Sequence, residues 1–212
     1  MPIKLLGLFP FYFLLISCDT PAEDKFIFFL HNRFLEEHHL EEAHPVYGRV
    51  EYAEIIQAFK ASGFKVISEQ RRGNVNARAY AASVVEQIDS LLEQGIPPNQ
   101  ISVVGTSKGG YIAQYVSTLA QNEALNFVFI GSFRISDLEA IPEINFCGNI
   151  LNIYERSDTF GSSAIERKRR STCTIQHFQE IELQTEMGHG FLFKALEEWI
   201  GPTIAWANGI YD

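Results

Sequence analysis

Short apolar runs alternate with stretches of helical periodicity along most of the chain. Six of these runs are mostly continuous rather than alternating, which is typical of strands covered on both faces of a sheet. The expected strands span residues 26–30, 64–68, 101–105, 126–130, 150–154 and 178–183. Strands separated by segments of helix length imply right-handed crossovers and a mainly parallel sheet. The pattern therefore predicts a three-layer α/β sandwich.

The segments between the strands carry apolar residues on one helical face. This spacing is found at Tyr52, Ile55, Ile56 and Phe59, and again at Ala81, Val84, Val85, Ile88, Leu91 and Leu92. Residues 192–207 form a last amphipathic segment. The longest piece without an assigned element runs from Asn32 to Gly48. We expect it to lie over the C-terminal edge of the sheet, where ligands bind in open α/β folds.

The N-terminal residues predict export. Lys4 precedes an apolar run over residues 5–16, which is shorter than the roughly 17–25 residues of a membrane-spanning helix. A basic start, a short apolar run and a small residue before the cut are typical of a secretory signal. The ending Leu15-Ile16-Ser17-Cys18 resembles a bacterial lipobox, whose cysteine is lipidated and begins the mature chain. An N-terminal strand with Cys18 as a buried thiol is the alternative.

These observations predict a signal peptide over residues 1–17, a lipidated Cys18 with a polar tether over residues 18–24, and one domain over residues 25–212. Removal of the signal takes away Lys4 and no acidic residue, which changes the net charge from −9 to −10. This balance argues against a nucleic-acid partner, which would need a basic face. The basic cluster at residues 167–170 is expected to be the solvated face of a surface helix, with an anion-binding patch as the alternative.

Two cysteines remain in the predicted mature domain besides Cys18. An even number of cysteines in an exported domain is compatible with a disulfide between Cys147 and Cys173. Two buried free thiols are the alternative, and the sequence does not decide between them. It does not predict the oligomeric state either.

The most specific motif is Gly105-Thr106-Ser107-Lys108-Gly109. It follows the apolar run at 101–104 and opens a helical segment at 111–119. In this context of strand, turn and helix, G-x-S-x-G indicates a nucleophile elbow, whose serine hydroxyl stands clear of the backbone. Ser107 is therefore a candidate nucleophile, provided that an acid and a base follow it in the order Ser, Asp or Glu, His.

Both partners are present downstream. His189 lies in a glycine-flanked loop between the last strand and the last helix, and it is the candidate base that would activate the serine hydroxyl. Asp158 lies in the loop after the strand at 150–154 and is the candidate acid that orients the imidazole. Glu155 and Asp137 are the rival acids.

With these motifs, the chain resembles the α/β-hydrolase superfamily in its small form without a cap domain. The resemblance covers roughly residue 25 to the C-terminus and rests on Leu30-His31, the Gly105–Gly110 elbow, Ser157-Asp158 and Gly188-His189-Gly190. It implies an oxyanion hole made by the backbone amide of Lys108 and a second donor from the loop after the first strand. Many such hydrolases carry His-Gly there, whereas this chain has His31-Asn32, so the second donor is the amide of Asn32 or Arg33.

The resemblance implies a serine hydrolase that cleaves a carboxylic ester, or an amide or thioester, through an acyl-enzyme, with no metal or organic cofactor. The expected substrate is a small-molecule or envelope ester, and the expected location is the bacterial cell envelope, with the domain anchored to the membrane by lipid on its periplasmic or extracellular face. A catalytically inactive, membrane-tethered binding protein is the alternative, which Asn32 favours. A metal site at His31, His38, His39 and His44 is a weaker alternative, because adjacent side chains diverge and no HExxH spacing is present.

Overall fold

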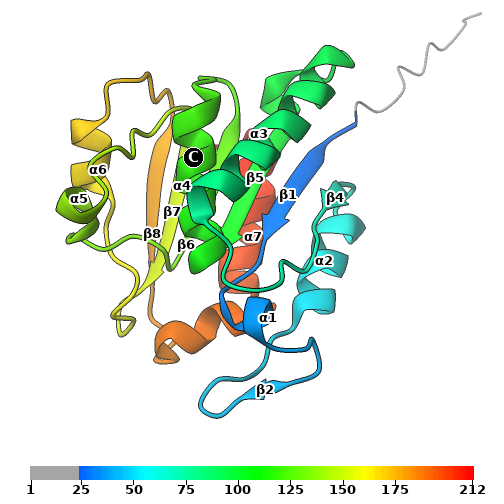
Figure 1. The fold of residues 1–212 in the computed structure, drawn as a ribbon, viewed down its shortest axis with the longest axis vertical. Helices are drawn as coiled ribbons and strands as arrows, with labels where there is room; N and C mark the ends of the chain where they lie inside the picture. The colour runs from blue at the N-terminus through cyan, green and yellow to red at the C-terminus, as the bar shows by residue number, and fades with distance from the viewer. Residues whose placement is uncertain (1–23) are drawn as a thin grey trace, which may run out of the picture.

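The computed structural model describes residues 24–212, so the predicted signal peptide and Cys18 lie outside the described residues. Its centre is a six-stranded, fully parallel sheet in the order β4-β1-β5-β6-β7-β8 (Figure 1). The strands are β1 (Phe26–Leu30), β4 (Lys65–Ile67), β5 (Ile101–Thr106), β6 (Asn126–Ile130), β7 (Asn149–Glu155) and β8 (Phe178–Leu183). The parallel sheet predicted from the apolar runs is thus confirmed.

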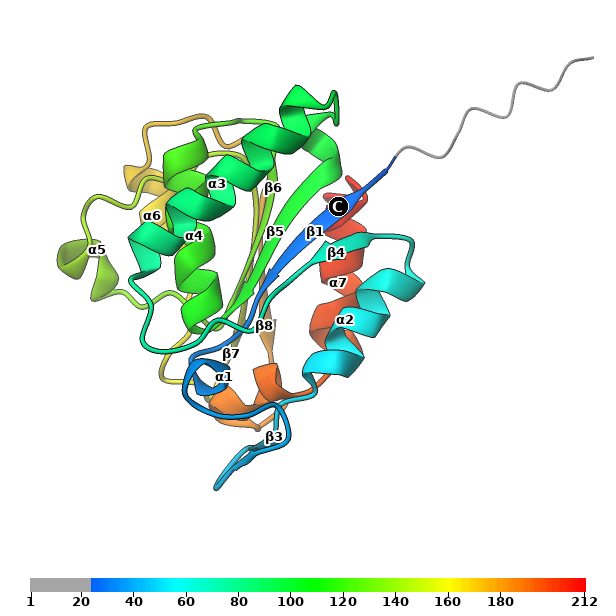
Figure 2. The ribbon, with the colours of Figure 1, turned by 45° about the vertical axis from the view of Figure 1, so that its right-hand side comes forward.

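Helices cover both faces of the sheet (Figure 2). On one face lie α2 (Tyr52–Ala61) and α7 (Glu197–Ala207), and on the other lie α3 (Ala77–Glu93), α4 (Lys108–Ala120), α5 (Asp137–Ala140) and α6 (Ile165–Arg170). The smaller elements are α1 (Phe34–Glu37), an antiparallel pair formed by β2 (Ala43–His44) and β3 (Gly48–Arg49), and the 3₁₀ turns η1 (Pro98–Gln100) and η2 (Gly188–Phe193). No helix within residues 24–212 has the length and apolar character needed to cross a membrane.

Each central strand contributes to two hydrophobic cores. In β1, Ile27 and Phe29 face the core under α2 and α7, whereas Phe28 and Leu30 face the core under α3 and α4. All four side chains are at most 4 % exposed. Because both faces are covered, every position of the strand is apolar, which explains the continuous runs in the sequence. The three-layer sandwich predicted from the sequence is therefore confirmed.

The last predicted helix is shorter than its apolar periodicity indicates. Instead of a helix from residue 192, the chain forms η2 and an extended link, and α7 begins only at Glu197. The backbone N–H of Ala195 donates to the carboxylate of Glu51 over 2.9 Å, and Leu196 has extended torsion angles. Leu192 and Phe193 of η2 are buried, and Ala195 and Leu196 of the link are partly buried, by tertiary packing rather than by a continuous helix.

The sequence predicted that all four basic residues of α6 face solvent, and this prediction is wrong for one of them. Arg167 is 2 % exposed, and its guanidinium donates to the carbonyl oxygens of Asp137, Ile141 and Ile144. It therefore binds the loop that follows β6 to α6. Arg169 and Arg170 do face solvent.

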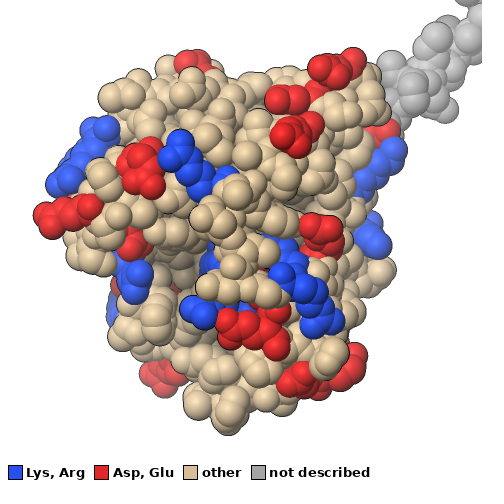
Figure 3. All heavy atoms as spheres, viewed as in Figure 1, with Lys and Arg blue, Asp and Glu red and all other residues tan. Residues whose placement is uncertain are grey.

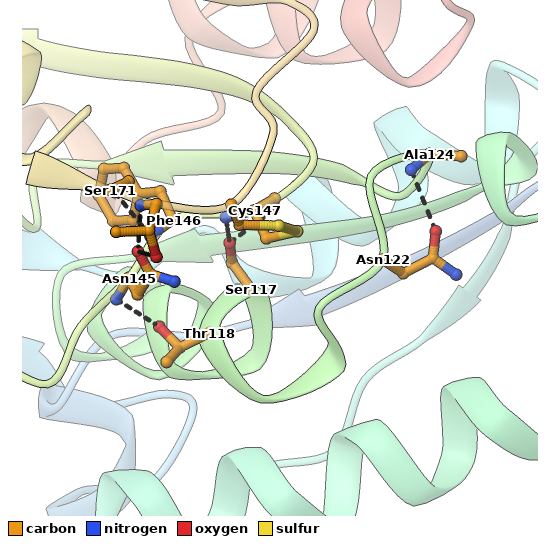
Figure 4. Close-up of a disulfide and its surroundings, with 10 residues drawn as sticks. Ser117, Thr118, Asn122, Ala124, Asn145, Phe146, Cys147 and Ser171 are labelled. Carbon is orange, nitrogen blue, oxygen red and sulfur yellow. Dashed lines mark hydrogen bonds between the residues drawn. A yellow bond between two sulfur atoms is a disulfide. The ribbon is translucent and has the colours of Figure 1, made fainter. Parts of the chain in front are cut away.

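Cys147 and Cys173 form a disulfide across 26 residues, which decides the question that the sequence left open (Figure 4). The hydroxyl of Ser117 on α4 donates to the carbonyl of Cys147 over 2.7 Å and accepts from its N–H over 2.8 Å. The two cysteines precede β7 and β8, respectively. The disulfide therefore fastens the N-terminal edge of the sheet, opposite the edge at which these strands end.

Candidate active site

The predicted elbow joins β5 directly to α4. Ser107 has φ of 50° and ψ of −119°, a left-handed backbone that is costly for a residue with a side chain. The turn requires glycine on both sides: an added Cβ would lie 2.3 Å from the carbonyl oxygen of Gly109 if placed on Gly105, and 1.8 Å from that of Leu30 if placed on Gly109. The two glycines thus allow strand and helix to approach closely enough to expose the serine.

The structure brings the three predicted catalytic side chains together. The Ser107 hydroxyl lies 2.8 Å from Nε2 of His189, and Nδ1 of the same ring lies 2.7 Å from Oδ2 of Asp158. Because a carboxylate only accepts, Nδ1 donates to Asp158, which leaves Nε2 to accept from Ser107. The Asp158 side chain is fully buried and His189 is 13 % exposed, so their hydrogen bond is shielded from water while the histidine still reaches the surface.

The two rival acids have other contacts. Asp137 accepts from the backbone N–H of Arg134 over 2.9 Å and lies 3.5 Å from its guanidinium. Glu155 accepts from backbone groups of its own loop and the next. Of the three candidate carboxylates, Asp158 is the one that contacts the histidine.

Glu155 has a role that sequence reasoning did not identify. One carboxylate oxygen accepts from the N–H and hydroxyl of Ser157, over 2.7 and 2.5 Å, in the loop that carries Asp158. The other accepts from the N–H groups of Thr185 and Glu186, over 3.1 and 3.2 Å, in the loop that leads to His189. The buried carboxylate therefore joins the acid loop to the histidine loop. A carboxylate at the end of a strand was the only sign of it in the sequence.

The two predicted oxyanion-hole residues also lie near Ser107. Lys108 is the first residue of α4, where backbone N–H groups have no partner within the helix. Leu30 pairs with Gly105 in the sheet, so Asn32 follows β1 at the same level as Ser107 follows β5. Asn32 is 2 % exposed, and its Nδ2 has no hydrogen-bond partner among residues 24–212. A buried amide donor without an acceptor thus lies in the loop where an oxyanion donor is expected.

A buried ionic network lies next to the loop after β1 that carries Asn32. Glu36 of α1 accepts from Arg71 over 2.9 Å and from the Lys108 ammonium over 2.5 Å. The ammonium also donates to the side-chain oxygen of Asn74 over 3.0 Å. Because Glu36 and Arg71 have no exposed side-chain surface, the network fixes α1 against α4, which begins directly after Ser107.

The histidines of the first loop are held in separate contacts. His31 donates from Nδ1 to its neighbour's carbonyl and accepts at Nε2 from the N–H of Arg71 over 2.8 Å. Burial, assisted by the charge of Arg71, lowers the pKa of His31 to about 3, so this ring stays neutral. His38 bonds to Glu42, and His44 stacks on Tyr47. Within residues 24–212, no three His, Cys, Asp or Glu side chains form a group that could hold a metal ion.

A pocket of about 400 Å³ opens beside the serine. Its walls come from the loop after β1, the loop before α3 and the first residue of α3, the start of α4, the loop after β6 with the start of α5, and the loop after β7. They comprise Arg33, Asn74, Val75, Ala77, Ser107, Lys108, Tyr111, Gly131, Ser132, Arg134, Asp137 and Phe160. The volume lies toward the lower end of the range of about 300–1,000 Å³ that is usual for ligand pockets.

Comparisons with known proteins find similar folds among solved structures. No protein-family model matches the chain, and no curated protein matches it. An arylesterase structure has a TM-score of 0.62 at 13% identity, covering 90% of this chain and 78% of its own. An esterase/lipase from an uncultured bacterium has a TM-score of 0.61 at 13% identity, over 89% and 76% of the two chains.

A protein of unknown function from Agrobacterium tumefaciens, named as a candidate α/β hydrolase, has a TM-score of 0.56 at 17% identity, over 90% of this chain and 89% of its own. At these identities the likeness concerns the fold. It agrees with the parallel sheet and the flanking helices described above. Residues 24–212 adopt the α/β-hydrolase fold.

Proposed function

We propose that the protein is a serine hydrolase that cleaves a carboxylic ester through an acyl-enzyme, with an amide or thioester as related substrates. The observation that carries the proposal is the hydrogen-bonded chain from Ser107 through His189 to buried Asp158, with distances of 2.8 and 2.7 Å. The esterase and hydrolase names among proteins of the same fold support it.

In this mechanism, the Ser107 oxygen attacks the ester carbonyl while Nε2 of His189 takes its proton. Asp158 stabilises the imidazolium that forms. The backbone N–H of Lys108 and a donor from Asn32 stabilise the oxyanion. The imidazolium then protonates the departing alcohol, which leaves an acyl group on Ser107. A water molecule, deprotonated by His189, cleaves this second ester and regenerates the serine.

A fluorophosphonate probe tests the proposal, because it reacts with an activated serine. The wild-type domain should be labelled on Ser107, whereas Ser107→Ala should not be labelled and His189→Ala should be labelled only weakly. Ser90→Ala, an exposed serine on α3, is the matched control and should be labelled like the wild type. Equal labelling of wild type and Ser107→Ala would reject the nucleophile and leave the tethered binding protein as the better hypothesis.

We also propose that the domain is attached to the bacterial envelope by lipid on Cys18. The proposal rests on the lipobox-like sequence; two or more acyl chains give stable anchoring where one does not. Since β1 begins at the sheet edge opposite Ser107, the site would then face away from the bilayer, toward soluble or envelope esters. Mass spectrometry of the membrane fraction should find a mature chain starting at lipidated Cys18, and Cys18→Ala should stay uncleaved. An unmodified chain with Met1 in the cytosol would reject this location.

A further inference from the structure

We infer that the pocket beside Ser107 selects esters that carry a second, ionised acid group a short apolar distance from the ester. The inference rests on the proposed function and adds the substrate class to it. Three observations support it: the charges on the pocket wall, the weak engagement of two of those charges, and the apolar surface between them.

The pocket wall is rich in positive charge, although the chain as a whole has a net charge of −9. Arg33, Lys108 and Arg134 line it, and Asp137 is the single acidic residue among its lining residues. Blue side chains lie on either side of the hollow below the centre of the molecule in Figure 3. Charge of one sign around a cleft raises the local concentration of substrates of the opposite sign.

Two of these cations are available to bind a ligand, because their ion pairs within the chain are exposed or long. Lys108 is not, because its ammonium is held by Glu36 and Asn74. Arg33 has an exposed pair with Glu37, with 60 % of its side chain accessible, and such pairs contribute little to stability. The guanidinium of Arg134 lies 3.5 Å from Asp137, a long contact that leaves most of its five donors open.

The surface between the arginines and the nucleophile is mostly apolar. Val75 and Ala77 form one wall, and the rings of Tyr111 and Phe160 form others. Phe160 is 51 % exposed, lies 4.9 Å from the His189 ring by centroid, and has the Arg134 guanidinium 6.0 Å from its ring centre. A ligand with an ester at one end, a few carbon atoms, and a carboxylate at the other end matches this order of surfaces. An arginine would bind that carboxylate by charge-assisted hydrogen bonds.

Pairs of esters that differ only in charge test the inference. Monomethyl adipate is compared with methyl adipamate, in which an amide replaces the carboxylate of the acyl part. The second pair is 4-acetoxybenzoate and 4-acetoxybenzamide, which place the charge on the leaving alcohol. For at least one pair, kcat/KM should be about tenfold higher for the anionic member at low ionic strength, and the ratio should fall as salt is added.

Substitution of the two arginines locates the effect. Arg33→Gln and Arg134→Gln should each reduce the charge preference through a loss of kcat/KM for the anionic esters, and the double variant should abolish the preference. Arg169→Gln on α6 is the matched control, because Arg169 is a similarly exposed arginine that does not line the pocket. Its charge preference should equal that of the wild type.

The outcomes separate this inference from the proposed function. Turnover of neutral and anionic esters at equal kcat/KM in both pairs would overturn the inference and retain the hydrolase. If no ester is turned over, calorimetry of the same pairs with Ser107→Ala measures the binding preference independently of catalysis. Tighter binding of the anionic members would support the inference without the hydrolase, and equal or absent binding would overturn it.

Discussion

The substitution Glu155→Gln tests whether the carboxylate that joins the two catalytic loops positions the histidine. Glutamine keeps the size of the side chain and replaces one acceptor oxygen by a donor. The buried carboxylate accepts four hydrogen bonds, two at each oxygen. In whichever way the amide turns, its NH₂ group faces at least one backbone N–H, and that N–H loses its acceptor.

The expected magnitudes follow from this count. Leaving one buried N–H without a partner costs about 1–3 kcal/mol, so the free energy of unfolding should fall by about that amount. The loops of Asp158 and His189 would no longer be joined at fixed separation. Because a misplacement of about 1 Å can cost about 10²-fold in rate, kcat should fall by about 10- to 100-fold while KM changes little.

Urea unfolding and steady-state kinetics on one ester measure both quantities. Glu182→Gln is the matched control: it removes an exposed carboxylate of neighbouring β8, whose partner is exposed Arg156. The control should change the free energy of unfolding by less than about 0.5 kcal/mol and leave kcat unchanged. A purely structural role would be indicated if Glu155→Gln lost stability but kept its kcat and pH profile, and wild-type values of both would refute the reasoning entirely.

Three other predictions follow from the structure. Asp158→Asn should keep the fold but lose kcat by about 10⁴-fold, the loss seen for this change in a serine protease; near-normal kinetics would transfer the role to another acid. His31 has a pKa of about 3 in the folded protein, below its unfolded value of 6.5, so its contribution to stability is complete above pH 6.5. On acidification toward pH 3 the free energy of unfolding should decline by up to about 1.4 kcal/mol per pH unit. Urea titrations should therefore give a shallower acid dependence for His31→Gln than for wild type. Reduction of the Cys147–Cys173 disulfide should lower the free energy of unfolding by about 3–4 kcal/mol and leave kcat/KM unchanged, because the bond lies at the opposite edge of the sheet; a loss of kcat/KM in the still folded, reduced protein would contradict this.

Features that depend on local sequence were predictable. A strand covered on both faces is mostly apolar, so β1 and β6 could be located to the residue from continuous runs that only Asn126, at the start of β6, interrupts. Ser107 was identifiable because its turn needs glycine on either side, a requirement that is visible in five consecutive letters. His189 and Asp158 could be ranked because each follows a strand in the order that the fold requires.

Features that depend on tertiary contacts were not predictable. Arg167 belongs to a run of four basic residues that look alike in the sequence. Its guanidinium binds three carbonyl groups of the segment after β6, a contact that exists only once this segment packs against α6. The start of α7 depends on Glu51, which is more than 140 positions away from its partner. In the sequence, Glu155 could be taken for a rival catalytic acid. Its real contacts could not be foreseen, because the groups that donate to it come from two loops about 30 residues apart.

The order of strands explains why a glycine also lies between the candidate catalytic groups. Ser107 follows β5 and Asp158 follows β7, so the hydrogen-bonded chain has to cross the end of β6, which lies between them. At that point stands Gly131, with φ of 55°. An added Cβ there would lie 3.0 Å from the Leu192 side chain and 3.3 Å from Oδ2 of Asp158, the atom that accepts from His189. The hydrogen-bonded chain from Asp158 through His189 to Ser107 therefore also requires a residue without a side chain at the end of β6.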